Sequence, residues 1–139
     1  ILAAVATGVY FKVPEQKIIN AIESYTPSNN RSQLIHAGSN EIIMDAYNAN
    51  PSSMKAAIEN FAKLHANQKI MLLGAMAELG QESLWEHEQL IKTIGQYQWD
   101  HVVLVGGDFL KIQHPYRSFA NSDEAKNWFR SQNFSNAHI

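Results

Sequence analysis

Residues 69–105, which read KIMLLGAMAELGQESLWEHEQLIKTIGQYQWDHVVLV, decide the fold. Two short apolar runs, residues 69–74 and 101–105, enclose a segment with helical periodicity from residue 82 to residue 96. A strand, a helix and a second strand in this order are typical of a βαβ unit, in which the two strands lie parallel. Because both runs are almost entirely apolar, we expect helices to cover both faces of the sheet.

The same alternation continues on either side of this segment. Pro51 opens a predicted helix over residues 51–65, and another helix is expected over residues 122–132, before a strand-like start at Ala137. Strands that alternate with helices of this length predict an α/β fold, a three-layer, Rossmann-like, mostly parallel sheet.

The stretch before residue 51 has a different character. Residues 34–37 and 41–45 are short strand-like runs split by a Gly-Ser-Asn turn, which predicts a β-hairpin.

Residues 1–11 and 14–25 predict a pair of helices, the second with Ile18, Ile19 and Ile22 as its buried stripe. The turn-rich residues 26–30 then suggest a linker, so we divide the chain into residues 1–32, a helical tail with a hinge, and residues 33–139, the main domain.

Composition excludes several classes of protein. The 139 residues, 45% of them apolar and 17% charged, suit one soluble globular domain rather than a disordered chain. A net charge of −2 without a dense basic run argues against nucleic acid as a partner. The sequence lacks cysteine and any uncharged apolar run long enough to span a bilayer, so disulfides and membrane insertion are not expected.

The turn after the second strand of the hairpin carries the densest polar chemistry. We call residues 45–53, which read DAYNANPSS, the Asp45 turn. Asn50 before Pro51 is a good N-cap, so the start of the helix points free N–H groups and partial positive charge at this turn. Ligands of α/β sheets bind beyond the carboxyl ends of the strands, so we expect a polar or anionic ligand here.

Two further turns follow strands of the predicted sheet. The Gly74 turn, residues 74–81, is bracketed by glycines, and we expect the Gly106 turn, residues 106–108, to be structural, because the dinucleotide spacing Gly-x-Gly-x-x-Gly is missing. A phosphate loop of the Gly-x-x-x-x-Gly-Lys-Ser/Thr type and a His-Glu-x-x-His metal motif are also missing from this sequence.

Two motifs together resemble the Mur ligase family, and within it the members that add D-alanyl-D-alanine. They are DAYNANPSSM at residues 45–54 and GAMAELG at residues 74–80, the latter with His87 downstream. The resemblance covers nearly the whole chain. One departure is plain: the second motif usually reads Gly-Asp-Met, whereas Ala75 replaces the acid here, so no role of that aspartate is carried over.

The resemblance implies a place in a larger bacterial, cytoplasmic and monomeric enzyme of three domains. Residues 1–32 would be the tail of its central ATP-binding domain, and residues 33–139 its C-terminal domain, ending before a last Lys-Gly-Ser motif. Such an enzyme uses ATP and Mg²⁺ to activate the carboxylate of UDP-N-acetylmuramoyl-tripeptide as an acyl phosphate, which the amine of D-alanyl-D-alanine attacks. The phosphate loop and magnesium ligands would lie in the central domain, so we expect these 139 residues alone to be inactive and to hold no catalytic residue or metal ligand.

The resemblance also implies two groups of binding residues. The nucleotide would be contacted by Arg31, Asp45, Tyr47 and Asn48, and the other substrates by Asn50, Ser52, Glu78 and His87.

Two alternatives stay open. The chain could belong to another Mur ligase or a folyl-polyglutamate ligase, although residues 47–51 speak against it. It could also be a free-standing doubly wound binding module, although the abrupt ends of the sequence favour a piece of a longer protein.

Overall fold

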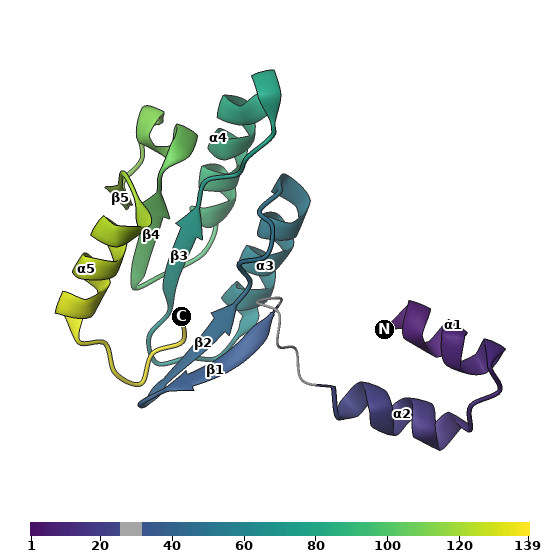
Figure 1. The fold of residues 1–139 in the computed structure, drawn as a ribbon. Helices are drawn as coiled ribbons and strands as arrows, with labels where there is room; N and C mark the ends of the chain where they lie inside the picture. Colours follow the sequence, from purple (N-terminus) through teal and green to yellow (C-terminus); the bar gives the residue numbers. More distant parts are fainter. Residues whose placement is uncertain (26–31) are drawn as a thin grey trace.

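The computed structural model describes residues 1–25 and 32–139 (Figure 1). Its strands are β1 (Gln33–Ala37), β2 (Asn40–Met44), β3 (Ile70–Gly74), β4 (His101–Val105) and β5 (Arg117–Phe119). Its helices are α1 (Leu2–Tyr10), α2 (Glu15–Glu23), α3 (Pro51–Lys63), α4 (Ser83–Ile94) and α5 (Ser122–Gln132), with short 3₁₀ segments η1 (Gly80–Glu82) and η2 (Gly107–Lys111).

A parallel sheet in the order β3-β4-β5 forms the centre of the molecule. Ile70 pairs with His101 and Gly74 with Val105, so β3, α4 and β4 make the predicted βαβ unit. Strand β5 was not predicted, because its three residues carry no apolar pattern. It pairs in parallel with β4 from Val103↔Arg117 to Val105↔Phe119, so its conformation is imposed by the neighbouring strand.

The end of the chain joins the hairpin to this sheet. Strands β1 and β2 pair antiparallel, as predicted, and Gly38 in their turn has a φ of 64°. His138 bridges in parallel to both Glu41 and Lys69. Its N–H donates to the Gln68 carbonyl at 2.8 Å. The strand-like segment predicted at Ala137 therefore lies between β2 and β3.

Helices cover both faces of the sheet, which gives the predicted three layers (Figure 1). The connections through α3 and α4 both run across the sheet towards β5, whereas the connection through α5 runs back to residues 137–139. Right-handed crossovers that run in opposite directions place their helices on opposite faces, so α3 and α4 lie together and α5 lies across the sheet from them.

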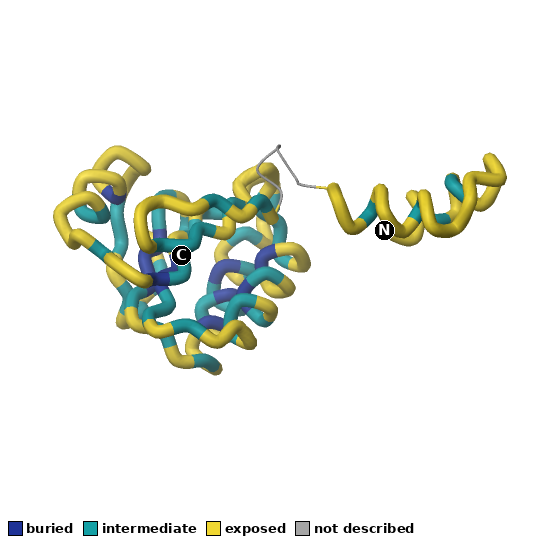
Figure 2. Tube along the Cα trace, turned by 90° about the horizontal axis from the view of Figure 1, so that it is seen from below, coloured by how far each residue is buried: buried dark blue, intermediate teal, exposed yellow. Residues whose placement is uncertain are grey.

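The core follows from this layering. Side chains alternate along β3 and β4: Met71, Val102 and Leu104 join the cluster beneath α3 and α4, whereas Ile70 and Val103 lie on the alternate positions. Figure 2 shows the buried residues gathered between the layers. The cluster beneath α3 and α4 consists of Met54, Ile58, Met71, Met76, Leu90, Ile94, Val102, Leu104 and Phe109.

The helices α1 and α2 form the predicted pair. Gly8 lies against Ile18, since a Cβ on Gly8 would come within 2.7 Å of its Cδ1 atom. The predicted buried stripe of α2 is wrong in part: Ile18 and Ile22 are half-buried, but Ile19 is exposed, because a helix packed against one short partner covers only a narrow face. None of the helices in residues 1–25 and 32–139 is long and apolar enough to cross a bilayer.

The predicted linker and Arg31 lie outside the described residues. The division of the chain at residue 32 stays a prediction.

Candidate functional site

Three turns meet at one edge of the sheet. Strands β2, β3 and β4 run in the same direction, so the Asp45, Gly74 and Gly106 turns all leave the carboxyl edge, where ligands of this fold class bind. Ala49 from the first turn and Ala75 and Leu79 from the second pack against the same hydrophobic cluster. The first two turns are therefore supported by the same hydrophobic cluster.

Asp45 ties the start of the domain to the end of β2. Its Oδ1 atom accepts a hydrogen bond from the backbone N–H of Ser32 at 3.2 Å. Ser32 has a φ of 46°, a left-handed conformation that serine rarely adopts. The Asp45 carboxylate is exposed and so lies at the surface beside Ser32.

Tyr47 and Asn48 follow in an irregular stretch between β2 and α3. Both side chains are exposed, Tyr47 to 63%, although a large aromatic ring is usually buried at least in part. Their exposure beside Asp45 gives this edge a phenol, an amide and a carboxylate within four consecutive residues, which suits the recognition of a polar ligand.

Asn50 caps α3, as predicted. Its side-chain oxygen accepts hydrogen bonds from the Ser53 N–H and the Ser52 hydroxyl, both at 2.9 Å. The Ser53 hydroxyl oxygen in turn accepts from the Asn50 N–H at 3.4 Å, which completes a capping box. The Asn50 side-chain oxygen is thus committed to the helix, and the exposed Ser52 hydroxyl donates its proton to that oxygen.

The N-terminus of α3 also borders a small groove. The cavity of about 270 Å³ between α3 and α4 is lined by Pro51, Ser52, Lys55, Glu86, Gln89, Leu90 and Thr93. Ser52, one of the predicted substrate-binding residues, therefore lines the same groove as residues of α4.

The Gly74 turn has an unusual backbone. Glu78 and Gly80 have φ values of 62° and 55°, and Glu78 has no glycine-like freedom to favour this conformation. The turn is fastened at its start, where the Ala75 N–H donates to the Val105 carbonyl at 2.9 Å, and by the buried side chain of Met76. The result is that Glu78 is presented to solvent at the edge.

His87 lies beneath this turn and is fully buried. Its Nε2 atom accepts from the Met76 N–H at 3.0 Å, and its Nδ1 atom lies 2.6 Å from the Ser83 carbonyl oxygen. The imidazole also packs edge-on against Phe109, with ring centroids 4.7 Å apart. In this arrangement His87 offers no surface to a substrate, so we replace the predicted direct contact with an indirect role.

The Gly106 turn packs against the Gly74 turn. Gly106 and Gly107 have φ values of 73° and 55°, which explains the glycine pair. The next residue, Asp108, is bound by Lys111 at 2.6 Å. Hydrogen bonds from Lys111 and from the Ser83 hydroxyl hold the pKa of Asp108 below its ordinary value of 3.8. Sequence reasoning missed this carboxylate, and only the glycine pair before it signalled a tight turn.

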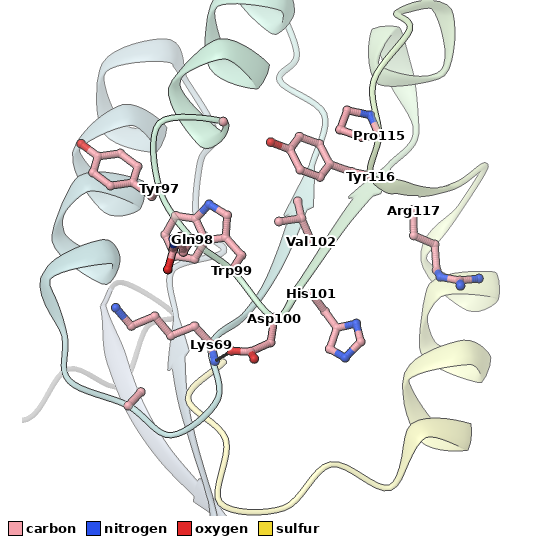
Figure 3. A pocket seen from close by; sticks show the side chains of 12 residues that line it. Lys69, Tyr97, Gln98, Trp99, Asp100, His101, Val102, Pro115, Tyr116 and Arg117 are labelled. Carbon is pink, nitrogen blue, oxygen red and sulfur yellow. Dashed lines mark hydrogen bonds between the residues drawn. The ribbon is translucent and has the colours of Figure 1, made fainter.

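A larger cavity lies at the other edge of the sheet (Figure 3). It has a volume of about 850 Å³ and lies near the amino ends of β3, β4 and β5. Its side chains serve the fold: Trp99 donates to the Ile94 carbonyl at 2.9 Å, and Asp100 accepts from the Lys69 N–H at 2.7 Å. Burial raises the pKa of Tyr116, which also lines it. We do not assign the ligand site to this cavity.

Comparison with known proteins adds to this geometry. A model of the family described as Mur ligase, glutamate ligase domain, matches residues 30–133. The UDP-N-acetylmuramoyl-tripeptide--D-alanyl-D-alanine ligase of Rickettsia prowazekii is 38% identical over 100 residues, which make up 68% of this chain and 22% of that protein. The ligase of the same name from Bacillus subtilis is 35% identical over 107 residues, or 76% of this chain and 23% of that protein. The chain thus spans less than a quarter of the length of these curated relatives.

Solved structures show the same architecture. MurF from Acinetobacter baumannii aligns with a TM-score of 0.82 at 27% identity, over 98% of this chain and 32% of that chain. The MurF ligase of Thermotoga maritima in complex with ADP aligns with a TM-score of 0.68 at 21% identity, over 84% of this chain and 27% of that chain, and supports the fold alone. The predicted α/β fold class is confirmed.

Proposed function

Because this chain belongs to the Mur ligase family, we propose that it is the C-terminal domain of the ATP-dependent ligase that joins D-alanyl-D-alanine to UDP-N-acetylmuramoyl-tripeptide. The observation that carries the proposal is the Asp45 turn: residues 45–54, the motif of the D-alanyl-D-alanine-adding members, stand at the carboxyl edge with an exposed carboxylate, phenol and amide. The enzyme would act in peptidoglycan precursor synthesis.

The reaction has two steps. The terminal carboxylate of the tripeptide attacks the γ-phosphorus of ATP, so that ADP leaves and an acyl phosphate forms. The free amine of D-alanyl-D-alanine then attacks the acyl carbon, phosphate leaves, and the amine loses a proton as the amide bond forms. An acyl phosphate hydrolyses in water, so a domain that closes over it and orients the amine favours ligation over hydrolysis.

The Asp45 turn would serve the nucleotide. A carboxylate at a strand end can accept hydrogen bonds from two ribose hydroxyls, and Asp45 is exposed and held in place by the Ser32 N–H. Tyr47 and Asn48 would line the base or ribose beside it. Arg31, the remaining residue of this predicted set, lies outside the described residues.

The amine substrate, D-alanyl-D-alanine, would be bound by residues that neighbour the nucleotide site. Ser52 lies exposed at the N-terminus of α3, where the helix dipole favours a carboxylate such as that of the dipeptide, and its hydroxyl would turn from Asn50 to donate to that carboxylate. Glu78 places an exposed carboxylate at the same edge, suited to an ammonium group. Asn50 acts as the cap that fixes this helix end.

Only the resemblance to the family implies that the enzyme requires Mg²⁺. Within residues 1–25 and 32–139 there is no trio of His, Cys, Asp or Glu side chains placed to hold a metal ion, so we derive no step from it. We further propose that the enzyme is monomeric and works in the bacterial cytoplasm, where its UDP-linked substrate would be made.

The test is a ligation assay on the full-length enzyme. Phosphate release is measured with ATP, Mg²⁺ and UDP-N-acetylmuramoyl-tripeptide, and with D-alanyl-D-alanine, L-lysine, diaminopimelate or glutamate as the amine. Among these four amines, we expect only D-alanyl-D-alanine to support turnover. Turnover with one of the single amino acids instead would assign the enzyme to another branch of the family.

The 139-residue chain by itself serves as the negative control. It contains no phosphate loop, so we expect neither ATP hydrolysis nor ligation from it. Measurable turnover by this chain would contradict the proposed division of labour between domains.

A further inference from the structure

Both ring nitrogens of His87 are used by the backbone, and this fixes its chemical form. A backbone N–H can only donate, so the Nε2 atom that faces the Met76 N–H at 3.0 Å must carry a lone pair. A carbonyl oxygen can only accept, so the Nδ1 atom at 2.6 Å from the Ser83 carbonyl must carry the proton. His87 is therefore neutral, with its proton on Nδ1.

The bond to Met76 reaches the middle of a turn that needs support. Two residues later the backbone enters the left-handed region at Glu78, a conformation that persists where surrounding contacts hold it in place. The Met76 side chain is 5% exposed and packs in the core, while its N–H is held by α4 through His87. The turn is thus anchored at Met76 by both its side chain and its N–H, two residues before the strained Glu78.

His87 also links this turn to the Gly106 turn. The Ser83 residue whose carbonyl accepts from Nδ1 uses its hydroxyl to bond Asp108, and Asp108 is paired with Lys111. The Phe109 ring, which follows the Gly106 turn, packs edge-on against the imidazole. One buried side chain therefore connects α4, the Gly74 turn and the Gly106 turn.

We propose that His87 is a positioning residue for the amine substrate: through the Met76 amide it fixes the Gly74 turn in the conformation that presents Glu78 at the carboxyl edge. This inference rests on the proposed ligase function for the identity of the substrate, but the hold of His87 on the turn is independent of it. Because His87 is fully buried, it touches neither substrate nor nucleotide and is not a catalytic residue.

A matched pair of variants in the full-length enzyme isolates the bond to Met76. In His87→Gln the side-chain oxygen reaches the place of Nε2 and can still accept from Met76, whereas the shorter side chain of His87→Asn reaches only the place of Nδ1 and can still donate to Ser83. Both variants lose the ring, but only the Gln variant keeps the bond to Met76 and only the Asn variant keeps the bond to Ser83, so a loosened turn in the Asn variant and not in the Gln variant assigns the hold to the Met76 bond. His36→Asn, at an exposed histidine in β1, is the control for loss of an imidazole.

Two readouts are needed. Hydrogen exchange followed by mass spectrometry on peptides that cover residues 74–82 measures how firmly the turn is held. Steady-state kinetics then separates KM for D-alanyl-D-alanine, KM for ATP and kcat.

We expect His87→Asn to speed exchange in residues 74–82 and to raise KM for the dipeptide, each by about tenfold, as loss of a buried hydrogen bond implies, while KM for ATP stays unchanged. His87→Gln should restore most of both effects, and His36→Asn should match the parent.

Equal exchange in the Asn variant and the parent, or equal behaviour of the Asn and Gln variants, would overturn the proposal, because His87 would then be only a core side chain. Faster exchange without any change in KM for the dipeptide would also overturn it, because the turn would not position the substrate. If the parent enzyme uses another amine, the proposed function fails, but the exchange measurements still decide whether His87 holds the turn.

Discussion

Gly107 lies directly against Ala75: a Cβ atom on Gly107 would overlap the Cβ atom of Ala75. The two residues belong to different turns, so this contact locks the Gly106 turn onto the Gly74 turn. It also gives a reason for a small residue at position 75, where the family motif usually has an aspartate, because any larger side chain must find room beside the neighbouring turn.

Because Gly107 lies against Ala75, we expect Gly107→Ala to lower the stability of the fold substantially. The new methyl group would overlap Ala75 and would also sit on a left-handed backbone, so we expect the free energy of unfolding to fall by about 2–4 kcal/mol. Urea unfolding of the 139-residue chain measures this. Gly38→Ala is the matched control, since Gly38 is also left-handed but has no atom within 4 Å of its would-be Cβ, and it should cost only about 1 kcal/mol. Equal costs for the two variants would refute the lock.

Asn50 should matter first for stability. Asn50→Ala removes the oxygen that accepts from Ser52 and Ser53, and we expect a loss of about 1 kcal/mol in the free energy of unfolding. Asn50→Asp keeps the acceptor and places negative charge at the positive end of α3, so its stability should stay within a few tenths of a kcal/mol of the parent. A loss as large in the Asp variant as in the Ala variant would mean that the cap is not the cause.

We expect the stability of the fold to depend on pH because of the Asp108 carboxylate. Hydrogen bonds from Lys111 and Ser83 lower the pKa of Asp108 in the folded state, so the unfolded chain binds the proton more tightly. The stabilisation is therefore complete above the ordinary value of 3.8 and is lost as the pH falls below it through the lowered pKa.

Accordingly, Asp108→Asn should be less stable than the parent near neutral pH, and the difference between them should shrink below the ordinary pKa of Asp108. Thermal unfolding at a series of pH values measures the difference. In a Lys111→Gln background the effect of Asp108→Asn should be smaller throughout, because one partner of the carboxylate is gone. A difference that is constant with pH would contradict the assignment.

Asp45 should matter for nucleotide rather than for folding. In the full-length enzyme we expect Asp45→Asn to raise the Kd for ATP by about tenfold, since a charged hydrogen bond to ribose is lost, with little change in the melting temperature. Calorimetric titration with a non-hydrolysable ATP analogue measures this. Asp123→Asn, at an exposed carboxylate on α5, should leave the Kd unchanged. Unchanged affinity in Asp45→Asn would remove Asp45 from the nucleotide site.

Much of the fold could be read from local pattern. The apolar runs at residues 69–74 and 101–105, the Asn50-Pro51 helix start and the Gly38 turn all appear where they were predicted, because strand burial, helix capping and left-handed turns depend on a few neighbouring residues. The resemblance to the Mur ligase family is confirmed as well.

The misses have a common cause. Strand β5 and the position of residues 137–139 between β2 and β3 depend on pairing with strands distant in the sequence, and a three-residue segment has no periodicity to reveal it. The exposed Ile19 on α2 likewise depends on what packs against the helix.

For the candidate site, the sequence by itself determined which chemical groups stand at the carboxyl edge: the carboxylate, phenol and amides of the Asp45 turn follow directly from the order of residues after β2. Only the tertiary structure decided what each group can do. It buried His87 with both nitrogens bonded, paired Asp108 with Ser83 and Lys111, and set Ala75 against Gly107. The contacts of His87 with Met76, of Asp108 with Ser83 and of Ala75 with Gly107 each join segments that are separate in the sequence, so packing across the sheet edge rather than local pattern sets them.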